Sequence, residues 1–219
     1  MAPFRSYADW PPLDAWNAHA GGLRSAGGAA IRFVAQPPRR RGVAPDVANL
    51  YDERIFTKGE VPSRAATWHD FFNMLVWASF PATKCAINAR QRRALRAWVD
   101  PAARRLPSAR TREQDALAMI DEGGALIASR GPLAADDVPA AVARGEARVL
   151  LLGHAVYEHL VVSSGAVRAF PWVVETDAPF DDVDALRRDV DARLARALAE
   201  APLDLRASRG LPVTDALFA

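Results

Sequence analysis

The chain places polar side chains at helical spacing inside stretches that are otherwise apolar. Three pairs of these residues stand four positions apart: His69 with Asn73, Lys84 with Asn88, and His154 with Glu158. Residues four apart share one face of a helix. A polar group in apolar surroundings costs free energy unless it has a partner. The pattern therefore predicts that folding gathers these groups into one cleft, where histidines, acids and amides suit acid–base chemistry.

Two interpretations of His154 and Glu158 remain open. Both side chains can ligate one metal ion, or the carboxylate can orient the imidazole. A catalytic zinc site needs a third protein ligand, for which His69, Asp70 and Asp115 are candidates. Alternatively, His154 bonds to backbone at the start of a helix while Glu158 forms an ion pair.

The other polar residues admit both functional and structural roles. His69 can act as a hydrogen-bond donor, a base or a ligand, because imidazole titrates near neutral pH. Thr67 stands three residues before Asp70, the spacing of a capping box with Asp in place of Glu. Lys84 can bind an anion or pair with Asp70 or Asp115. The spacing of Arg112 and Asp115 favours a local ion pair.

Hydrophobic periodicity predicts four main helices that carry or support these residues. The helix that begins at Thr67 ends before Phe80-Pro81, because proline disfavours helical geometry in the preceding residue. Asp181 and Asp182 suit the N-terminus of a helix whose apolar face carries Val183, Leu186, Val190, Leu194 and Leu198. The predicted helices cover residues 67–79, 83–99, 154–163 and 181–200.

Several short apolar runs predict strands. They cover residues 31–35, 148–152 and 167–175, and a hairpin of 116–120 with 125–128 around Asp121-Glu122-Gly123-Gly124. Asp121 and Glu122 are interpreted as turn residues. The sequence thus predicts an α+β fold, in which a small, mostly antiparallel sheet is packed by four or more helices. Residues 1–50 are predicted to form an irregular extension packed on a single domain of residues 51–219.

The amino-acid composition of the chain bears on its cellular location and on whether it binds membranes or nucleic acids. Of the 219 residues, 50% are hydrophobic and 25% charged, the net charge is +2, and Cys85 is the single cysteine. A lone cysteine fits a reducing compartment, so we expect a cytoplasmic protein. No stretch is long and apolar enough for a signal peptide or a membrane span. Eight arginines between residues 90 and 112 would suit phosphates, but Trp98 is the one aromatic among them, which argues against nucleic-acid binding.

Three sequence blocks carry a family resemblance. TWHDFFNMLVWASFPATKCAINARQ, RTREQDALAMIDEGG and LLLGHAVYEHLV follow one another in the chain. In this order and spacing they resemble the bacterial family known only as domain of unknown function 3025. The likeness runs from Tyr51 to Glu158, whereas Leu211-Pro212-Val213 is the one echo of the family's proline-rich C-terminus. The resemblance implies no activity, because the family has none assigned.

The sequence leads to two functional hypotheses. The first is a small hydrolase-like enzyme that acts on a small or anionic ligand, with metal and cofactor left open; its candidate residues are His69, Asp70, Asn73, Lys84, Asn88, Asp115, His154 and Glu158. The alternative is a non-catalytic binding or scaffold protein in which the same residues form a buried structural network. No phosphate-binding glycine loop and no G-x-S-x-G elbow occurs.

Overall fold

A computed structural model describes residues 4–38, 46–99, 109–163, 165–200, 210–214 and 217. The longer helices are α1 (Leu13–His19), α2 (Tyr51–Lys58), α3 (Trp68–Ser79), α4 (Pro81–Trp98), α5 (Arg112–Gly123), α6 (Val138–Ala143), α7 (His154–Val162) and α8 (Val183–Glu200). The strands are β1 (Arg32–Ala35), β2 (Glu60–Ser63), β3 (Gly124–Ser129), β4 (Ala147–Leu151), β5 (Arg168–Glu175) and β6 (Leu211–Pro212). Short 3-10 turns cover Val47–Asn49 and Ala135–Asp137.

The four predicted helices are confirmed as α3, α4, α7 and α8, and none of their ends is shifted by more than two residues. The Thr67 hydroxyl accepts a hydrogen bond from the Asp70 backbone N–H, as expected of an N-cap. Phe80 leaves helical geometry, and Pro81 begins α4 directly, earlier than predicted. On α8 the Asp182 carboxylate caps Ala185 N–H. Val183, predicted on the apolar face of α8, is instead 62% exposed.

The prediction of a mostly antiparallel sheet is wrong, because the larger sheet is mixed. Its strand order is β4-β3-β5-β6. The central β3 pairs antiparallel with β4 and parallel with β5. A parallel pair needs a long connection, which α6, β4 and α7 supply between β3 and β5. The strands β1 and β2 form a separate parallel pair.

The predicted hairpin at residues 116–128 is also wrong. Its first arm is helical, since α5 runs to Gly123 and β3 starts at Gly124 without a turn between them. The Thr111 hydroxyl and the Gln114 side chain form a reciprocal capping box at the start of α5. This cap stabilises the start of α5, so residues 116–120 are helical although their short apolar run predicted a strand.

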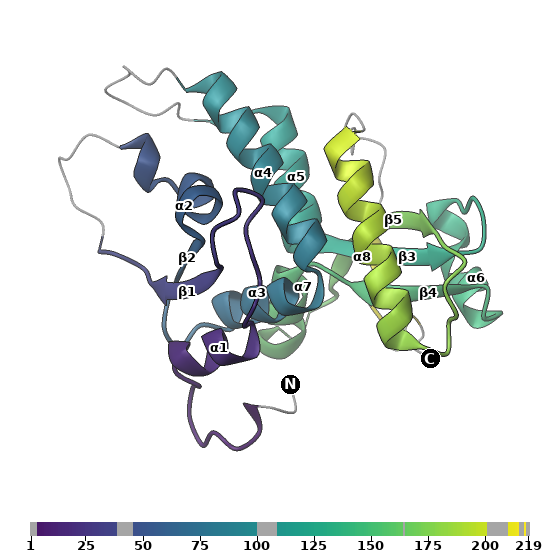
Figure 1. Ribbon diagram of the computed structural model, residues 1–219. Coiled ribbons are helices and arrows are strands. Elements are labelled where there is room, and N and C mark those ends of the chain that lie inside the picture. The colour runs from purple at the N-terminus through teal and green to yellow at the C-terminus, as the bar shows by residue number, and fades with distance from the viewer. Residues whose placement is uncertain are drawn as a thin grey trace.

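Three buried clusters build the core around α4. One lies between α4, α8 and one face of the larger sheet, and a second covers the opposite face with α6. The third joins α3 to the N-terminal segment, where Trp16 and Phe33 are almost fully buried. Figure 1 shows β1, β2 and α2 on one side of α4 and the larger sheet with α8 on the other. Residues before 50 therefore contribute α1, β1 and core side chains.

Candidate functional site

A close approach between two backbone segments positions the first site residue. The Gly153 N–H donates to the carbonyl of Gly124, so the start of α7 lies against the junction of α5 and β3. A Cβ atom on Gly153 would stand 2.6 Å from the Glu122 carbonyl oxygen, which leaves room only for glycine. This contact brings His154, the first residue of α7, beside Asp121 at the end of α5.

A chain of hydrogen bonds then joins α5, α7 and α3. His154 Nδ1 lies 2.8 Å from the backbone carbonyl oxygen of Asp121. The Nε2 atoms of His154 and His69 are 3.1 Å apart. His69 Nδ1 lies 3.0 Å from Glu158 Oε2. Folding thus brings together His69 and His154, which are far apart in sequence.

The hydrogen-bond partners of the two imidazoles indicate which of their ring nitrogens carry protons. Because a carbonyl oxygen only accepts, His154 donates from Nδ1 and presents a lone pair at Nε2. His69 must therefore donate to it from Nε2. The second ring nitrogen of His69, Nδ1, has the carboxyl group of Glu158 as its partner. Burial, the positive charges of Lys84 and His69, and the opposing effect of Asp121 together lower the pKa of His154 to about 4.

Lys84 of α4 extends the same network. Its ammonium is nearly buried, with 4% of the side chain exposed. It donates to Asn73 Oδ1 at 2.8 Å and to Asp121 Oδ1 at 2.5 Å. The Trp77 ring lies 5.4 Å from Nζ. An ammonium has three N–H donors, so one remains without a hydrogen-bond partner among the described residues.

Asp121 is the carboxylate that compensates this buried cation. Burial would raise the pKa of Asp121, but Lys84 and the two histidines outweigh that effect and lower it. Lys84 therefore forms an ion pair, but with Asp121 and not with Asp70 or Asp115, the two partners that the sequence suggested. The second oxygen, Oδ2, lies 4.0 Å from His154 Nδ1, and 21% of the side chain is exposed.

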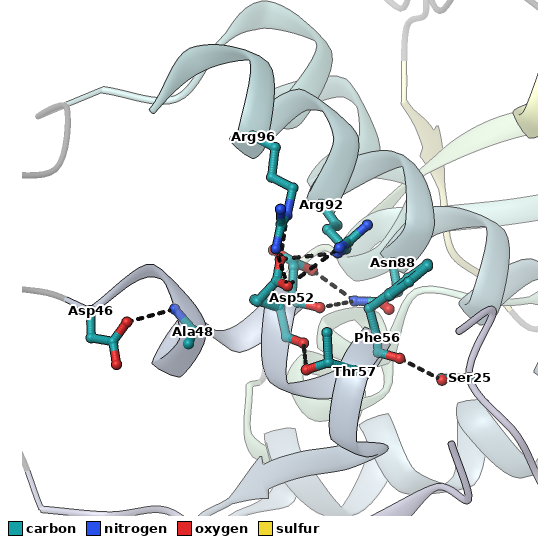
Figure 2. Close-up of polar contacts among 10 residues, drawn as sticks. Ser25, Asp46, Ala48, Asp52, Phe56, Thr57, Asn88, Arg92 and Arg96 are labelled. Carbon is teal, nitrogen blue, oxygen red and sulfur yellow. Dashed lines mark hydrogen bonds and ion pairs between the residues drawn. The ribbon is translucent and has the colours of Figure 1, made fainter. Parts of the chain in front are cut away.

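Helix α2 adds two residues to the site. Asn73 donates from Nδ2 to the Tyr51 hydroxyl at 3.2 Å, which leaves the phenolic proton for another acceptor. Asn88 donates to the backbone and side-chain oxygens of Asp52 at 3.1 and 3.2 Å, as Figure 2 shows. Asn88 Oδ1 is buried and has no partner within the described part of the chain.

The pKa of Asp52 is shifted towards neutral pH, which makes this residue the strongest candidate for acid–base chemistry in the site. Burial raises its pKa to about 6; the negative charge of Asp121 adds to this, while Asn88 and Lys84 oppose it. Burial and the nearby Asp121 also raise the pKa of Tyr51. A carboxyl group that titrates near 6 exchanges protons readily close to neutral pH.

The residues of the site differ in exposure: some are buried and others are partly exposed. Lys84, Asn73, Asn88 and His154 are each at most 7% exposed. The side chains of His69 and Glu158 are 30% and 32% exposed, and Tyr51 is 43% exposed.

Two predicted site residues lie outside this network. Asp70 accepts hydrogen bonds from the backbone and guanidinium of Arg64, so it fixes the chain before α3 and does not complete a capping box. Burial would raise the pKa of Asp70, but the bonds from Arg64 lower it. Asp115 is exposed, and no ion pair with Arg112 occurs among the described residues. The structure thus joins six of the eight candidates and separates these two.

The sequence pattern missed Tyr51, Asp52 and Asp121. Tyr51 opens the segment that resembles the family, so that resemblance was the available signal for α2. Asp121 was assigned to a turn because two glycines follow it. The capping box of α5 was the signal for a helix at this position.

Among the described residues, three of the eight arginines between residues 90 and 112 bond to carboxylates. Arg92 and Arg96 of α4 bond to the buried Glu53 of α2, and Arg90 bonds to Glu113 of α5. Arg104 and Arg105 lie outside the described residues. Within the described ranges, no helix is long and apolar enough to cross a membrane. No three His, Cys, Asp or Glu side chains in those ranges are grouped so as to hold a metal ion.

A family comparison covers most of the chain. The family described as protein of unknown function (DUF3025) matches residues 31–215. The chain belongs to this family. The DUF3025 match extends beyond the Tyr51–Glu158 segment at both ends and so includes β1, α8 and β6. No curated protein and no solved structure matches the chain.

Proposed function

We propose that this DUF3025 protein is a small hydrolase-like enzyme in which Asp52 exchanges protons and Lys84 binds a substrate oxygen. The proposal rests on the Asp52 carboxyl group, whose pKa burial raises to about 6 while the charge of the buried Lys84 ammonium opposes that rise. Titratable groups with strongly shifted pKa values gather at active sites more often than elsewhere. Asp121 and Asn73 hold the ammonium in one orientation.

These residues supply the parts of a hydrolytic step. The Asp52 carboxylate accepts a proton from a water molecule, and the water oxygen attacks the electrophilic centre of the substrate. The remaining N–H of Lys84 stabilises the negative charge that develops on the substrate oxygen. Protonated Asp52 then returns its proton to the leaving group. Substrates with an anionic or carbonyl oxygen suit this arrangement.

The two histidines position the site in this proposal. Each ring nitrogen of His69 and His154 already has a hydrogen-bond partner. Neither imidazole therefore has an atom left for a substrate in this arrangement. Their chain of bonds fixes the backbone of Asp121, which in turn orients Lys84.

A substrate panel with matched variants tests the proposal. The purified protein is assayed on carboxylic esters, amides, phosphoesters and lactones. Asp52→Asn and Lys84→Met are expected to reduce the activity that appears by at least ~100-fold, the usual size of an acid–base contribution. Lys58→Met and Asp115→Asn are controls: Lys58 is the only other lysine, and Asp115 is exposed outside the network. Equal loss in the controls, or full activity in Asp52→Asn, contradicts the proposal.

Every ring nitrogen of His69 and His154 already has a hydrogen-bond partner within the protein. This favours a second candidate function, that of a non-catalytic binding or scaffold protein. In that case the network fixes the relative positions of α3, α5 and α7. Lys84→Met and His154→Gln would then lower stability, and no substrate class would be turned over.

We also propose a bacterial cytosol as the location, from the family resemblance and from the single cysteine. The Cys85 thiol donates to the carbonyl of Arg24, and burial raises its pKa to about 11. Such a thiol stays protonated and unreactive, as expected of a structural cysteine in a reducing compartment.

A further inference from the structure

A cavity lies between the N-terminal segment and the start of α3, away from the polar network described above. Its volume is about 510 Å³, which is within the range of small-molecule sites. Aromatic side chains form most of its wall: Phe4, Tyr7, Trp10, Trp68 and Phe71. The proposed hydrolytic site uses none of them.

The rings of this aromatic pocket stand at steep angles to one another. The ring centroids of Trp10 and Trp68 are 4.7 Å apart with planes inclined by 61°. Phe71 meets the two indoles edge to face, at 6.3 and 6.2 Å. Phe4 packs on Phe71 at 5.2 Å and 78°. The rings therefore pack edge to face on one another while they line the same cavity.

Two charged residues also line the aromatic pocket. Asp9 is exposed, and one of its oxygens caps the Trp10 backbone N–H at 2.8 Å. Its other oxygen has no partner among the described residues. Arg5 lines the same pocket and is also exposed. The acid lies on the short side chain beside Trp10, whereas the guanidinium is on a long side chain that can extend into solvent.

We propose that the aromatic pocket binds a quaternary ammonium group. Aromatic faces attract cations through their quadrupole, and cages of aromatic rings with a nearby acid are a common solution for methylated ammonium ligands. A quaternary ammonium has no N–H donors, so the aromatic faces alone can satisfy its whole surface. Tyr7, 43% exposed, leaves the pocket open on one side.

The competing explanation is that these rings merely hold residues 4–11 against α3. Hydrophobic packing alone makes no distinction between a cation and a neutral molecule of the same shape. Choline and 3,3-dimethyl-1-butanol form such a pair, because a carbon atom replaces the charged nitrogen. Their relative affinity therefore separates the two explanations.

The experiment is a titration of the full chain with each compound, followed by calorimetry and by amide chemical shifts. We expect choline to bind about tenfold more tightly than the alcohol, from the usual strength of a partly desolvated cation–π contact. Shifts should map to residues 4–11 and the start of α3. Equal affinities of choline and the alcohol would overturn the proposal.

Matched variants test whether the preference for choline arises in the aromatic pocket. Tyr7→Leu should remove most of the preference for choline without unfolding the chain, because Tyr7 is largely exposed. Trp98→Leu is the control, since Trp98 is 54% exposed on α4 and does not line the aromatic pocket. Asp9→Asn should weaken choline binding and Arg5→Gln should strengthen it. An unchanged choline preference in Tyr7→Leu would assign the binding elsewhere and reject the pocket.

The source of the ammonium group is distinguished by a further titrant. Nα-acetyl-Nε-trimethyllysine amide presents the same group as a methylated protein side chain would. Tighter binding of this compound than of choline identifies a protein-borne ligand, and the reverse order identifies a free small molecule. Either order supports the aromatic pocket, whereas failure of both compounds overturns it.

Discussion

At the scale of single residues, protonation states organise the site. Burial, Lys84 and His69 lower the pKa of His154, while His69 bridges His154 and Glu158 through its two ring nitrogens. The two rings differ because one faces a carbonyl and the other a carboxylate. Asp52 differs from Asp121 for a related reason: Asp121 receives Lys84 directly, whereas burial dominates at Asp52.

His154 predicts a dependence of stability on pH. Its pKa is about 4 in the folded chain, below the ordinary 6.5 that applies after unfolding. As the pH falls from 6.5 towards 4, the unfolded chain binds a proton that the folded chain does not. Stability should therefore decrease over that window by about 3 kcal/mol.

Urea unfolding at a series of pH values measures this effect. His154→Gln should flatten the pH dependence in that window, since glutamine can still donate to Asp121 and accept from His69. His159→Gln is the control, because His159 is on the same helix but exposed. A wild-type slope in His154→Gln would show that another group is responsible.

The sequence predicted part of this chemistry at residue scale. Four-residue spacing was enough to place His69 with Asn73 and Lys84 with Asn88 on common helix faces. It could not supply the partners, because Glu158 bonds to His69 of another helix and not to His154 of its own. Contacts between helices depend on packing, which a single sequence pattern does not contain.

At the scale of elements, α2 is positioned by a buried ion cluster. Glu53 is 2% exposed and accepts hydrogen bonds from Arg92 and Arg96 of α4 (Figure 2). Hydrogen bonds from Arg96 and then from Arg92 lower the pKa of Glu53 against the effect of burial. Because Tyr51 and Asp52 precede Glu53 directly, this cluster also fixes their place in the site.

Glu53→Gln should therefore affect both stability and the site. Loss of the charge-assisted bonds is expected to cost about 2 kcal/mol. Arg96→Gln should cost less than Glu53→Gln, because the Arg96 side chain is 54% exposed and water screens its charge. Thermal unfolding measures both variants. Equal costs for the two, or a stable Glu53→Gln protein, would show that the cluster does not anchor α2.

Helices with strong end signals were predictable, and the sheet was not. Thr67 and Pro81 mark α3 and α4, and Asp182 marks α8. The segment after Arg112 was assigned to a strand because its apolar run is short, although Gln114 completes a cap there. The parallel pairing of β3 with β5 joins segments more than 40 residues apart, and no local pattern specifies such a pairing.

At the scale of the whole molecule, the site lies where separate parts of the core meet. Tyr157 of α7 packs against all three buried clusters. Site residues come from α2, α3, α4, α5 and α7, so each of these helices must be in place before the network closes. This explains why the sequence indicated separate polar pairs and not one centre.

The most direct test of the account is the titration of the Asp52 carboxyl carbon by NMR, assigned with Asp52→Asn. We predict a pKa of about 6, and a further rise in Lys84→Met, because the ammonium that favours the carboxylate is then lost. Lys58→Met should leave the value unchanged. A titration of Asp52 near the ordinary value of about 4, unaffected by Lys84→Met, would contradict the proposed acid–base site.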